Sequence, residues 1–336
     1  MTQTPIAAVV MAAGLGSRMR SAVPKHFHPI LGRRLADWVI EAGRAAGASP
    51  LVVVAAPSAR DAFGAEDVTV AVQAEPLGTG DSVRSARAAL DGFDGDVLVL
   101  PGDAPMLRPE TLAELVEAHR REGAAATILS AIPPDPRVYG RIVRSGDGSV
   151  LRIAEGTDAT PEELAIREIN SSIYAFRSSL LWSALERLQP KNVQGELYLT
   201  DAIEIVARVG GKVWAHIAAD SRETDGVNTR AELAKAAAVL RDRINDAHIL
   251  AGVTIVDPQT TWIEPTVELE PDATVQPFTY LRGATRVGAG AQIGANTVAI
   301  DAHIGAKATI GPFCYLRPGT VLGESSKAGT FVEIKN

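Results

Sequence analysis

The sequence predicts an α/β layered domain, a connecting helix and a partial parallel β-helix of hexapeptide repeats. Three observations support this architecture. Short apolar runs alternate with helical patterns over residues 1–228, helical spacing continues over residues 229–250, and aliphatic residues recur every six positions over residues 251–336. We therefore predict three parts with these boundaries.

Four apolar runs predict the strands of the first part. They lie at residues 6–12, 51–56, 68–73 and 96–103. Each is almost continuously apolar, which is typical of parallel strands that are buried on both faces of a sheet. The segments "RLADWVIEAGRAAG" and "GTGDSVRSARAAL" between them have helical spacing. Such alternation of strands and helices indicates an α/β layered fold.

The stretch "NTRAELAKAAAVLRDRINDAHIL" predicts one long connecting helix. Apolar residues at steps of four, three and four place one stripe on a helical face, namely Leu233, Ala237, Leu240 and Ile244.

From residue 251 the hydrophobic period changes to six. Two phased aliphatic series cover residues 269–293 and 304–334, with one slip between them. A column of small or β-branched residues stands two positions before each aliphatic residue, and Cys314 belongs to it. In a repeat of this kind, each six-residue segment forms one side of a stacked coil. We therefore predict that Cys314 is a stacked small residue and not a catalytic thiol.

Composition excludes several classes of protein. The formal net charge of −7 argues against a general nucleic-acid binder, which needs an electropositive face. The single cysteine excludes an internal disulfide and suits a reducing compartment. No apolar stretch approaches the length of a membrane span, and no signal peptide is recognisable. These features predict a cytoplasmic protein.

The stretch "VVMAAGLGSRMRSAVPK" predicts a phosphate site. Backbone N–H groups of a glycine turn that follows a strand can approach a phosphate closely. Arg18 offers a bidentate fork and Lys25 a compact charge, which suits a pyrophosphate group. A dinucleotide-binding loop is disfavoured because Met19 stands at its third glycine position, and the P-loop pattern is absent.

Two further turns carry candidate ligands. In "LVLPGDAPML", Asp103 follows a buried strand, and its carboxylate beside a phosphate site is a natural ligand for Mg²⁺. The alternative is that Asp103 is a turn residue or caps a helix. In "QAEPLGTGDSV", Gly78 and Thr79 allow a close approach to a ligand, and Gln73 can pair with an amide-like edge such as uracil. The alternative is a strand-to-helix turn that Thr79 or Asp81 caps.

Eight motifs, in order, resemble those of the sugar-1-phosphate nucleotidyltransferases: "AAGLGSRM…PK", "QAEPLGTG", "PGDAPML", "YGRIV", "EGTDAT", "REIN", "QGELYLTD" and "GVNTR". The chain is more closely similar to the bifunctional N-acetylglucosamine-1-phosphate uridyltransferase/glucosamine-1-phosphate acetyltransferase family, and the similarity extends through "GPFCYLRPGT…FVEIKN". The resemblance implies a Rossmann-like nucleotidyltransferase domain followed by a left-handed parallel β-helix.

The resemblance also implies a reaction and its site residues. The sugar phosphate attacks the α-phosphorus of UTP, with Mg²⁺, to give UDP-N-acetylglucosamine and pyrophosphate for peptidoglycan precursors. The implied roles are nucleotide binding by Ala12, Ala13, Gly14, Gln73, Gly78 and Thr79; phosphate binding by Arg18 and Lys25; Mg²⁺ binding by Asp103 and Asn228; and sugar binding by Gly140, Glu155, Asn170 and Thr200. For Asn228, capping of the connecting helix is the alternative.

For the second domain the resemblance implies acetyl transfer, with Arg317 and Lys335 at the matching sugar-phosphate contacts. The family's catalytic His and acetyl-CoA contacts would lie beyond Asn336, so we expect a C-terminally truncated chain without acetyltransferase activity. The family trimerises through its β-helix, and we expect a homotrimer that is weakened by the shorter helix.

Two departures from the family pattern lie beside the predicted phosphate and sugar sites. His26 follows Lys25 where an aliphatic residue is expected, and Ser172 stands where a glycine is usual. We predict that His26 is a neighbour of the phosphate site or a surface residue. The alternative functions are a uridylyl- or thymidylyltransferase for another sugar 1-phosphate and a catalytically silent nucleotide-binding assembly protein.

Overall fold

The computed structural model describes residues 4–14, 16–63, 67–136, 139–156, 159–190, 192 and 194–334. The chain divides into two compact units, which we call unit 1 (residues 1–28 and 34–229) and unit 2 (residues 29–33 and 230–336). The three-part division of the chain stays a prediction. Within the described ranges, no helix combines the length and the apolar character needed to span a membrane.

Unit 1 is built on one nine-stranded sheet that contains the four predicted strands. Its order is β11 (Val213–Ile217), β7 (Ala126–Ala131), β10 (Ile169–Arg177), β6 (Asp96–Pro101), β1 (Ile6–Ala12), β4 (Leu51–Ala55) and β5 (Thr69–Val72), and β8 (Arg141–Arg144) and β9 (Val150–Ala154) extend from β10. Strand β1 is parallel to β4 and β6, whereas β10 runs antiparallel to β6 and β7.

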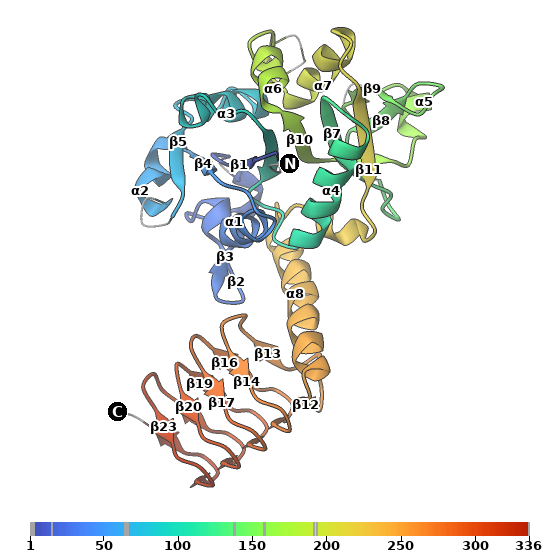
Figure 1. Cartoon of the computed structure of the whole chain (residues 1–336). Coiled ribbons are helices and arrows are strands. Elements are labelled where there is room, and N and C mark those ends of the chain that lie inside the picture. The colour runs from blue at the N-terminus through green and yellow to red at the C-terminus, as the bar shows by residue number, and fades with distance from the viewer. Residues whose placement is uncertain are drawn as a thin grey trace. The chain divides into compact units, whose positions relative to one another are not determined.

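Both faces of this sheet are covered, which explains the continuous apolar runs. Val9 of β1 packs into the core on one face and Val10 into the core on the other, because successive side chains of a strand point to opposite faces. The first core includes residues of α3 (Thr79–Ser85), α6 (Ser178–Leu185) and α7 (Leu199–Arg208); the second includes residues of α1 (Leu35–Ala45) and α4 (Pro109–Arg121) (Figure 1).

The remaining elements of this part of the chain are short. They are the helices α2 (Arg60–Phe63) and α5 (Pro161–Leu164) and the 3₁₀ turns η1 (Ser17–Met19), η2 (Lys25–Phe27), η3 (Pro57–Ala59), η4 (Arg87–Leu90) and η5 (Ser221–Thr224). The separate two-stranded sheet of β2 (Pro29–Ile30) and β3 (Arg33–Arg34) lies mainly in unit 2, which includes residues 29–33. Because β1, β5 and β6 are parallel, the loops after them meet at one edge of the sheet. The antiparallel β10 begins at that same edge.

Unit 2 contains α8 (Arg230–Leu250) and a parallel β-helix with three sheets. The first sheet contains β12 (Thr254–Ile255), β15 (Thr274–Val275), β18 (Gln292–Ile293), β21 (Thr309–Ile310) and β24 (Lys327–Ala328). The second contains β13 (Trp262–Ile263), β16 (Tyr280–Arg282), β19 (Val298–Ile300), β22 (Tyr315–Leu316) and β25 (Glu333–Ile334). The third contains β14 (Glu268–Leu269), β17 (Arg286–Val287), β20 (His303–Ile304) and β23 (Val321–Leu322).

The hexapeptide period is confirmed, and its slip has a structural explanation. Val275 pairs with Ile293, eighteen positions later, but Ile293 pairs with Ile310, only seventeen positions later. One coil is therefore a residue shorter than its neighbours, and the aliphatic column stays inside. Cys314 is 2% exposed in the small-residue column, as predicted, and its thiol lies 3.0 Å from the carbonyl oxygen of Gly329.

The connecting helix is confirmed, but its buried stripe was predicted only in part. Leu240 is buried as expected, whereas the other fully buried residues of α8 are Ala236 and Asn245. The Asn245 amide donates to the carbonyl oxygens of Pro258 and Thr261 at 2.9 and 3.0 Å. These two bonds allow the polar side chain of Asn245 to be buried, although the hydrophobic pattern of the sequence predicts that it is exposed to solvent.

Candidate functional site

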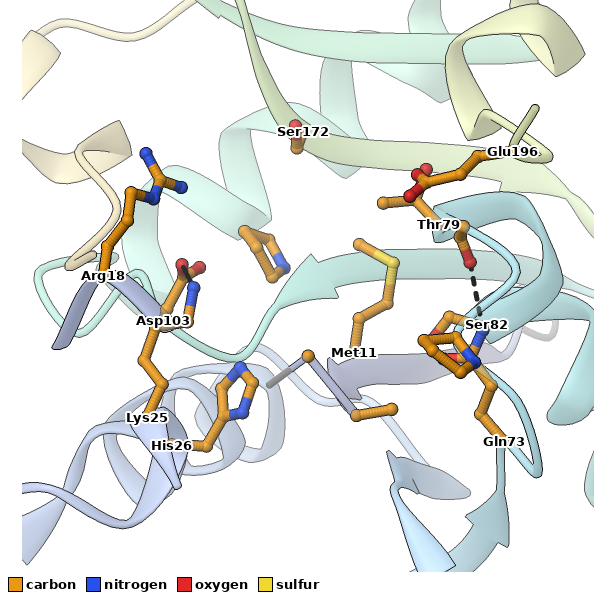
Figure 2. Close-up of a pocket in the computed structure, with 15 residues that line it drawn as sticks. Met11, Arg18, Lys25, His26, Gln73, Thr79, Ser82, Asp103, Ser172 and Glu196 are labelled. Atoms are coloured by element: carbon orange, nitrogen blue, oxygen red, sulfur yellow. Dashed lines mark hydrogen bonds and ion pairs between the residues drawn. The ribbon is translucent and has the colours of Figure 1, made fainter. Parts of the chain in front are cut away.

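A cleft of about 460 Å³ opens where the loops after β1, β5 and β6 meet. Figure 2 shows Arg18, Lys25 and Asp103 on one side of it and Gln73, Thr79 and Glu196 on the other. Eight residues with predicted site roles line the cleft, namely Ala13, Gly14, Arg18, Lys25, Gln73, Gly78, Thr79 and Asp103. The structure therefore brings these eight residues together around one cleft. Ala12 lies at the end of β1, immediately before these residues.

The first side of the cleft holds two cations and two oxygen donors, which we call the cation cluster: Arg18, Lys25, Asp103 and Asn228. The Lys25 ammonium forms an ion pair with Asp103 Oδ2 and donates to Asn228 Oδ1 at 3.0 Å. Arg18 Nη2 donates to the same Asn228 oxygen at 2.9 Å. A backbone hydrogen bond also joins the segments that carry Asp103 and Asn228, since the Val227 N–H donates to the Asp103 carbonyl oxygen at 2.8 Å.

Gly16 allows Lys25 to reach this position. Its φ of 64° lies in the left-handed region, and a Cβ atom there would lie 2.4 Å from Lys25 Cβ. The predicted glycine turn thus brings the η1 and η2 segments together, in addition to exposing its backbone N–H groups.

The second side of the cleft is organised by Gln73. Its Nε2 donates to the Gly78 carbonyl oxygen at 3.1 Å and to Asp81 Oδ2 at 3.0 Å. Both amide hydrogens are therefore used within the protein, and Oε1 is the group left to accept from a ligand.

Helix capping by Thr79 or Asp81 is wrong for this turn. Gly78 is the N-cap of α3 and makes no side-chain cap. Thr79 Oγ1 instead accepts from the Leu199 N–H at 3.0 Å, which ties the start of α3 to α7. A Cβ atom on Gly78 would lie 2.6 Å from the Leu197 carbonyl oxygen, so this close approach requires glycine.

The four predicted sugar-binding residues gather where β8, β9, β10 and α7 meet. The Asn170 N–H donates to the Gly140 carbonyl oxygen at 2.8 Å, and Thr200 Oγ1 donates to Glu155 Oε1 at 2.7 Å. A Cβ atom on Gly140 would lie 3.5 Å from Glu155 Oε2. None of the four is among the residues that line the 460 Å³ cleft within the described part of the chain.

Several residues of the cleft were not predicted, and Glu196 is the most informative. It belongs to the quoted motif "QGELYLTD", from which only Thr200 was selected. Its position as a carboxylate in a recognised motif could have identified Glu196 as a candidate for the cleft. The other unpredicted residues that line the cleft are Met11, Pro76, Ser82 and Pro101, and Ser172, which the sequence analysis placed beside the predicted sites, lines it too.

His26 also lines the cleft and is 3% exposed, so its assignment to the surface is wrong. Burial lowers the pKa of His26 to about 4, against an opposing effect of the Asp103 carboxylate.

Of the two residues matched to acetyl transfer, the structure describes only Arg317. Arg317 forms an ion pair with Glu333, and its guanidinium carbon lies 5.7 Å from the centroid of the Tyr315 ring. Lys335 lies outside the described residues.

The cation cluster fits a divalent cation. Asp103 supplies a carboxylate and Asn228 an amide oxygen, and both contact Lys25 Nζ, so the two hard donors lie close together. Among the residues that the structure describes, no group of three or more His, Cys, Asp or Glu side chains could hold a metal by itself. This donor set suits Mg²⁺, which commonly combines one or two protein ligands with water and substrate phosphates.

Asn228 lies two residues before α8, which begins at Arg230. Its amide oxygen accepts from both cations, and this favours a role in the cation cluster over helix capping.

Comparison with known proteins shows what the chain is similar to. The family model of the MobA-like NTP transferase domain matches residues 8–145. A relative called bifunctional protein GlmU from Streptomyces avermitilis is 46% identical over an alignment that covers 99% of this chain and 74% of the relative.

Two further relatives with that name come from Pelobacter propionicus and Geobacter metallireducens. They are 46% and 47% identical over 292 residues, or 86% of this chain. The aligned region spans 64% and 61% of their own lengths, less than two thirds in each case.

Proposed function

Since the chain belongs to the family of the bifunctional protein GlmU, we propose that it is a sugar-1-phosphate nucleotidyltransferase. Its reaction joins UTP and N-acetylglucosamine 1-phosphate into UDP-N-acetylglucosamine and pyrophosphate, in the cytoplasm. The observation that carries the proposal is the cation cluster, which faces Gln73 and Thr79 across one cleft (Figure 2). The choice of sugar and the link to cell-wall precursors come from the family resemblance.

The reaction needs positioning and charge compensation more than a nucleophilic side chain. A phosphate oxygen of the sugar phosphate forms a bond to the α-phosphorus of UTP. The bond from that phosphorus to the bridging oxygen breaks, and its electron pair leaves with pyrophosphate. Arg18 and Lys25 offset the negative charge that develops on the pyrophosphate, in a part-buried site where such interactions are strengthened.

The nucleotide is held by backbone groups and by one amide. Ala12, Ala13 and Gly14 present backbone to the ribose and phosphates at the end of β1. Gln73 offers Oε1 to the N3–H of uracil, because both hydrogens of its amide are used by Gly78 and Asp81. Thr79 fixes the turn beside the ribose through its bond to the Leu199 N–H.

The sugar is held by the four residues around Glu155. The Thr200 hydroxyl donates to one oxygen of the Glu155 carboxylate and so orients the other oxygen toward a hydroxyl or amide N–H of the substrate. Asn170 and Gly140 form the adjoining wall through their backbone hydrogen bond.

Asp103 and Asn228 would hold the divalent cation, which the resemblance identifies as Mg²⁺. When bound, Mg²⁺ supplies charge neutralisation for the phosphates. Lys25 contacts both oxygen donors and balances the Asp103 charge before the substrates bind.

Pyrophosphate release tests the proposal. We would compare N-acetylglucosamine, glucosamine and glucose 1-phosphates with UTP or dTTP, each with Mg²⁺ and after chelation. Release with UTP and the N-acetylated sugar, abolished by chelation, supports the assignment. Release with another sugar or with dTTP replaces the substrate. No release from any pair favours the silent nucleotide-binding alternative, and undiminished release by Asp103→Ala contradicts the metal assignment.

We also propose that unit 2 associates as a homotrimer, since the family trimerises through this domain; sedimentation equilibrium measures the assembly.

A further inference from the structure

His26 is a buried polar residue to which the proposed reaction assigns no role. It lies in η2, directly after Lys25, and its side chain lines the cleft although it is only 3% exposed. Nδ1 is buried and has no hydrogen-bond partner among the described residues. Burial of a polar ring without partners is costly, so its place in a ligand cleft needs an explanation.

The direction of the ring follows from the two glycine turns beside it. A Cβ atom on Gly14 would lie 3.8 Å from His26 Cε1, and one on Gly102 would lie 3.2 Å from His26 Cδ2. Cε1 and Cδ2 flank Nε2 in the imidazole ring. Nε2 therefore faces the space between the turn that leads to Arg18 and the turn that leads to Asp103, beside the Lys25–Asp103 ion pair (Figure 2).

The protonation of the ring follows from its surroundings. Because burial lowers the pKa of His26 to about 4, the imidazole is neutral near pH 7 and carries one N–H. A buried N–H without a partner is rarer in proteins than an unpaired acceptor. The proton therefore belongs on Nε2, and the unpartnered Nδ1 is left as an acceptor.

We propose that His26 is a phosphate-binding residue, whose Nε2–H donates a hydrogen bond to a phosphate oxygen of the bound nucleoside triphosphate. This inference rests on the proposed function. Arg18 and Lys25 supply charge at this side of the cleft, and His26 adds a directional neutral donor. A neutral ring beside the Lys25–Asp103 ion pair does not repel the Lys25 ammonium.

Three substitutions separate the hydrogen bond from simple packing. The amide nitrogen of His26→Gln can occupy the place of Nε2, that of His26→Asn can occupy only the place of Nδ1, and His26→Leu fills the space without a donor. We would measure UTP binding by titration calorimetry with Mg²⁺ and without sugar phosphate. We expect the Gln variant to stay within about threefold of wild type, and the Asn and Leu variants to bind roughly tenfold more weakly or worse.

The matched control is His119→Leu, which changes another buried histidine of unit 1 outside the cleft and should not alter UTP affinity. Thermal unfolding of every variant shows whether it is folded; if His26→Leu is not, the Gln and Asn pair decides. Wild-type affinity in the Leu or Asn variants, or rescue by Asn and not by Gln, overturns the proposal.

The two proposals fail in different ways. A wild-type protein that neither binds UTP nor releases pyrophosphate overturns both of them. Normal pyrophosphate release by the wild type together with equal UTP affinity in all three His26 variants overturns only the role of His26.

Discussion

At the residue scale, the hydrogen bond between Thr200 and Glu155 links two segments that the chain separates widely. Thr200 lies at the start of α7 and is buried, whereas Glu155 follows β9. The 2.7 Å bond fixes one oxygen of a carboxylate that would otherwise choose among rotamers. We therefore expect the sugar affinity of the proposed site to depend on Thr200, which acts through Glu155.

Thr200→Val keeps the shape of the side chain and removes this donor. We expect the KM for N-acetylglucosamine 1-phosphate to rise roughly tenfold and the KM for UTP to stay within about twofold, because a hydrogen bond to a charged group contributes about 1.5–3 kcal/mol. Thr200→Ser retains the hydroxyl and is the control. Steady-state pyrophosphate release measures both constants, and an equal rise of both would contradict the assignment to the sugar.

At the element scale, the turn between β1 and η2 sets the position of the cation cluster. Gly16 adopts φ 64° and lies against Lys25, whereas Gly14 is open enough that a Cβ atom would lie 3.8 Å from His26 Cε1. The two glycines of one motif therefore differ in function. Gly16 permits a close approach of two segments, and Gly14 leaves backbone accessible to a ligand.

Gly16→Ala should displace Lys25, because the added Cβ atom would lie 2.4 Å from Lys25 Cβ in a backbone conformation that disfavours alanine. We expect kcat for pyrophosphate release to fall by at least about tenfold, as expected for a misplaced charge at the reacting phosphates. Gly47→Ala is the matched control, since Gly47 also has a positive φ (88°) but no heavy atom within 4 Å of the added carbon. Similar losses of kcat in both variants would show that backbone strain alone is responsible.

At the scale of the whole molecule, the chain has separate hydrophobic cores. Two cores cover the faces of the unit 1 sheet, and a third fills the β-helix of unit 2. The β-helix core is a stack in which each coil contacts only its neighbours. We therefore expect a defect in one coil to lower the stability of unit 2 first.

Leu281→Ala removes a side chain that is fully buried in the β-helix. We expect a loss of about 2–5 kcal/mol in the stability of unit 2, from lost transfer free energy and a new cavity. Hydrogen exchange should become faster in unit 2 and remain unchanged in β6 of unit 1. Leu250→Ala is the control, since Leu250 is 89% exposed. Equal acceleration in both units would show that they unfold together.

The stability of unit 1 should also depend on pH through His26. Its pKa of about 4 in the folded state is below the ordinary value of 6.5, so the unfolded state binds more protons between these values. As pH drops from 7.5 to 4, the free energy of unfolding of the wild type should fall by about 3 kcal/mol more than that of the His26→Gln variant. Urea titrations across this range measure it, and parallel curves for both proteins would contradict it.

The sequence by itself determined the alternation of strands and helices in unit 1, the repeat of unit 2 and eight of the residues that line the cleft. Apolar runs such as that around Val9 are typical of strands buried on both faces, and a sustained period of six is typical of a stacked coil, because local side-chain spacing dictates both patterns. The glycine turn, Arg18, Lys25 and Asp103 were identified because they follow predicted strands, whose parallel ends meet at one edge.

Only the tertiary structure decided which groups remain for a ligand. Arg18 and Asn228 are 210 positions apart, yet they share a hydrogen bond, and no local pattern specifies such a pairing. The donors of Gln73 proved to be used internally, and His26 proved to be buried beside two glycine turns, with a ring nitrogen that has no partner among the described residues. Local spacing fixes the secondary structure, but the partners of each polar atom depend on where distant segments pack.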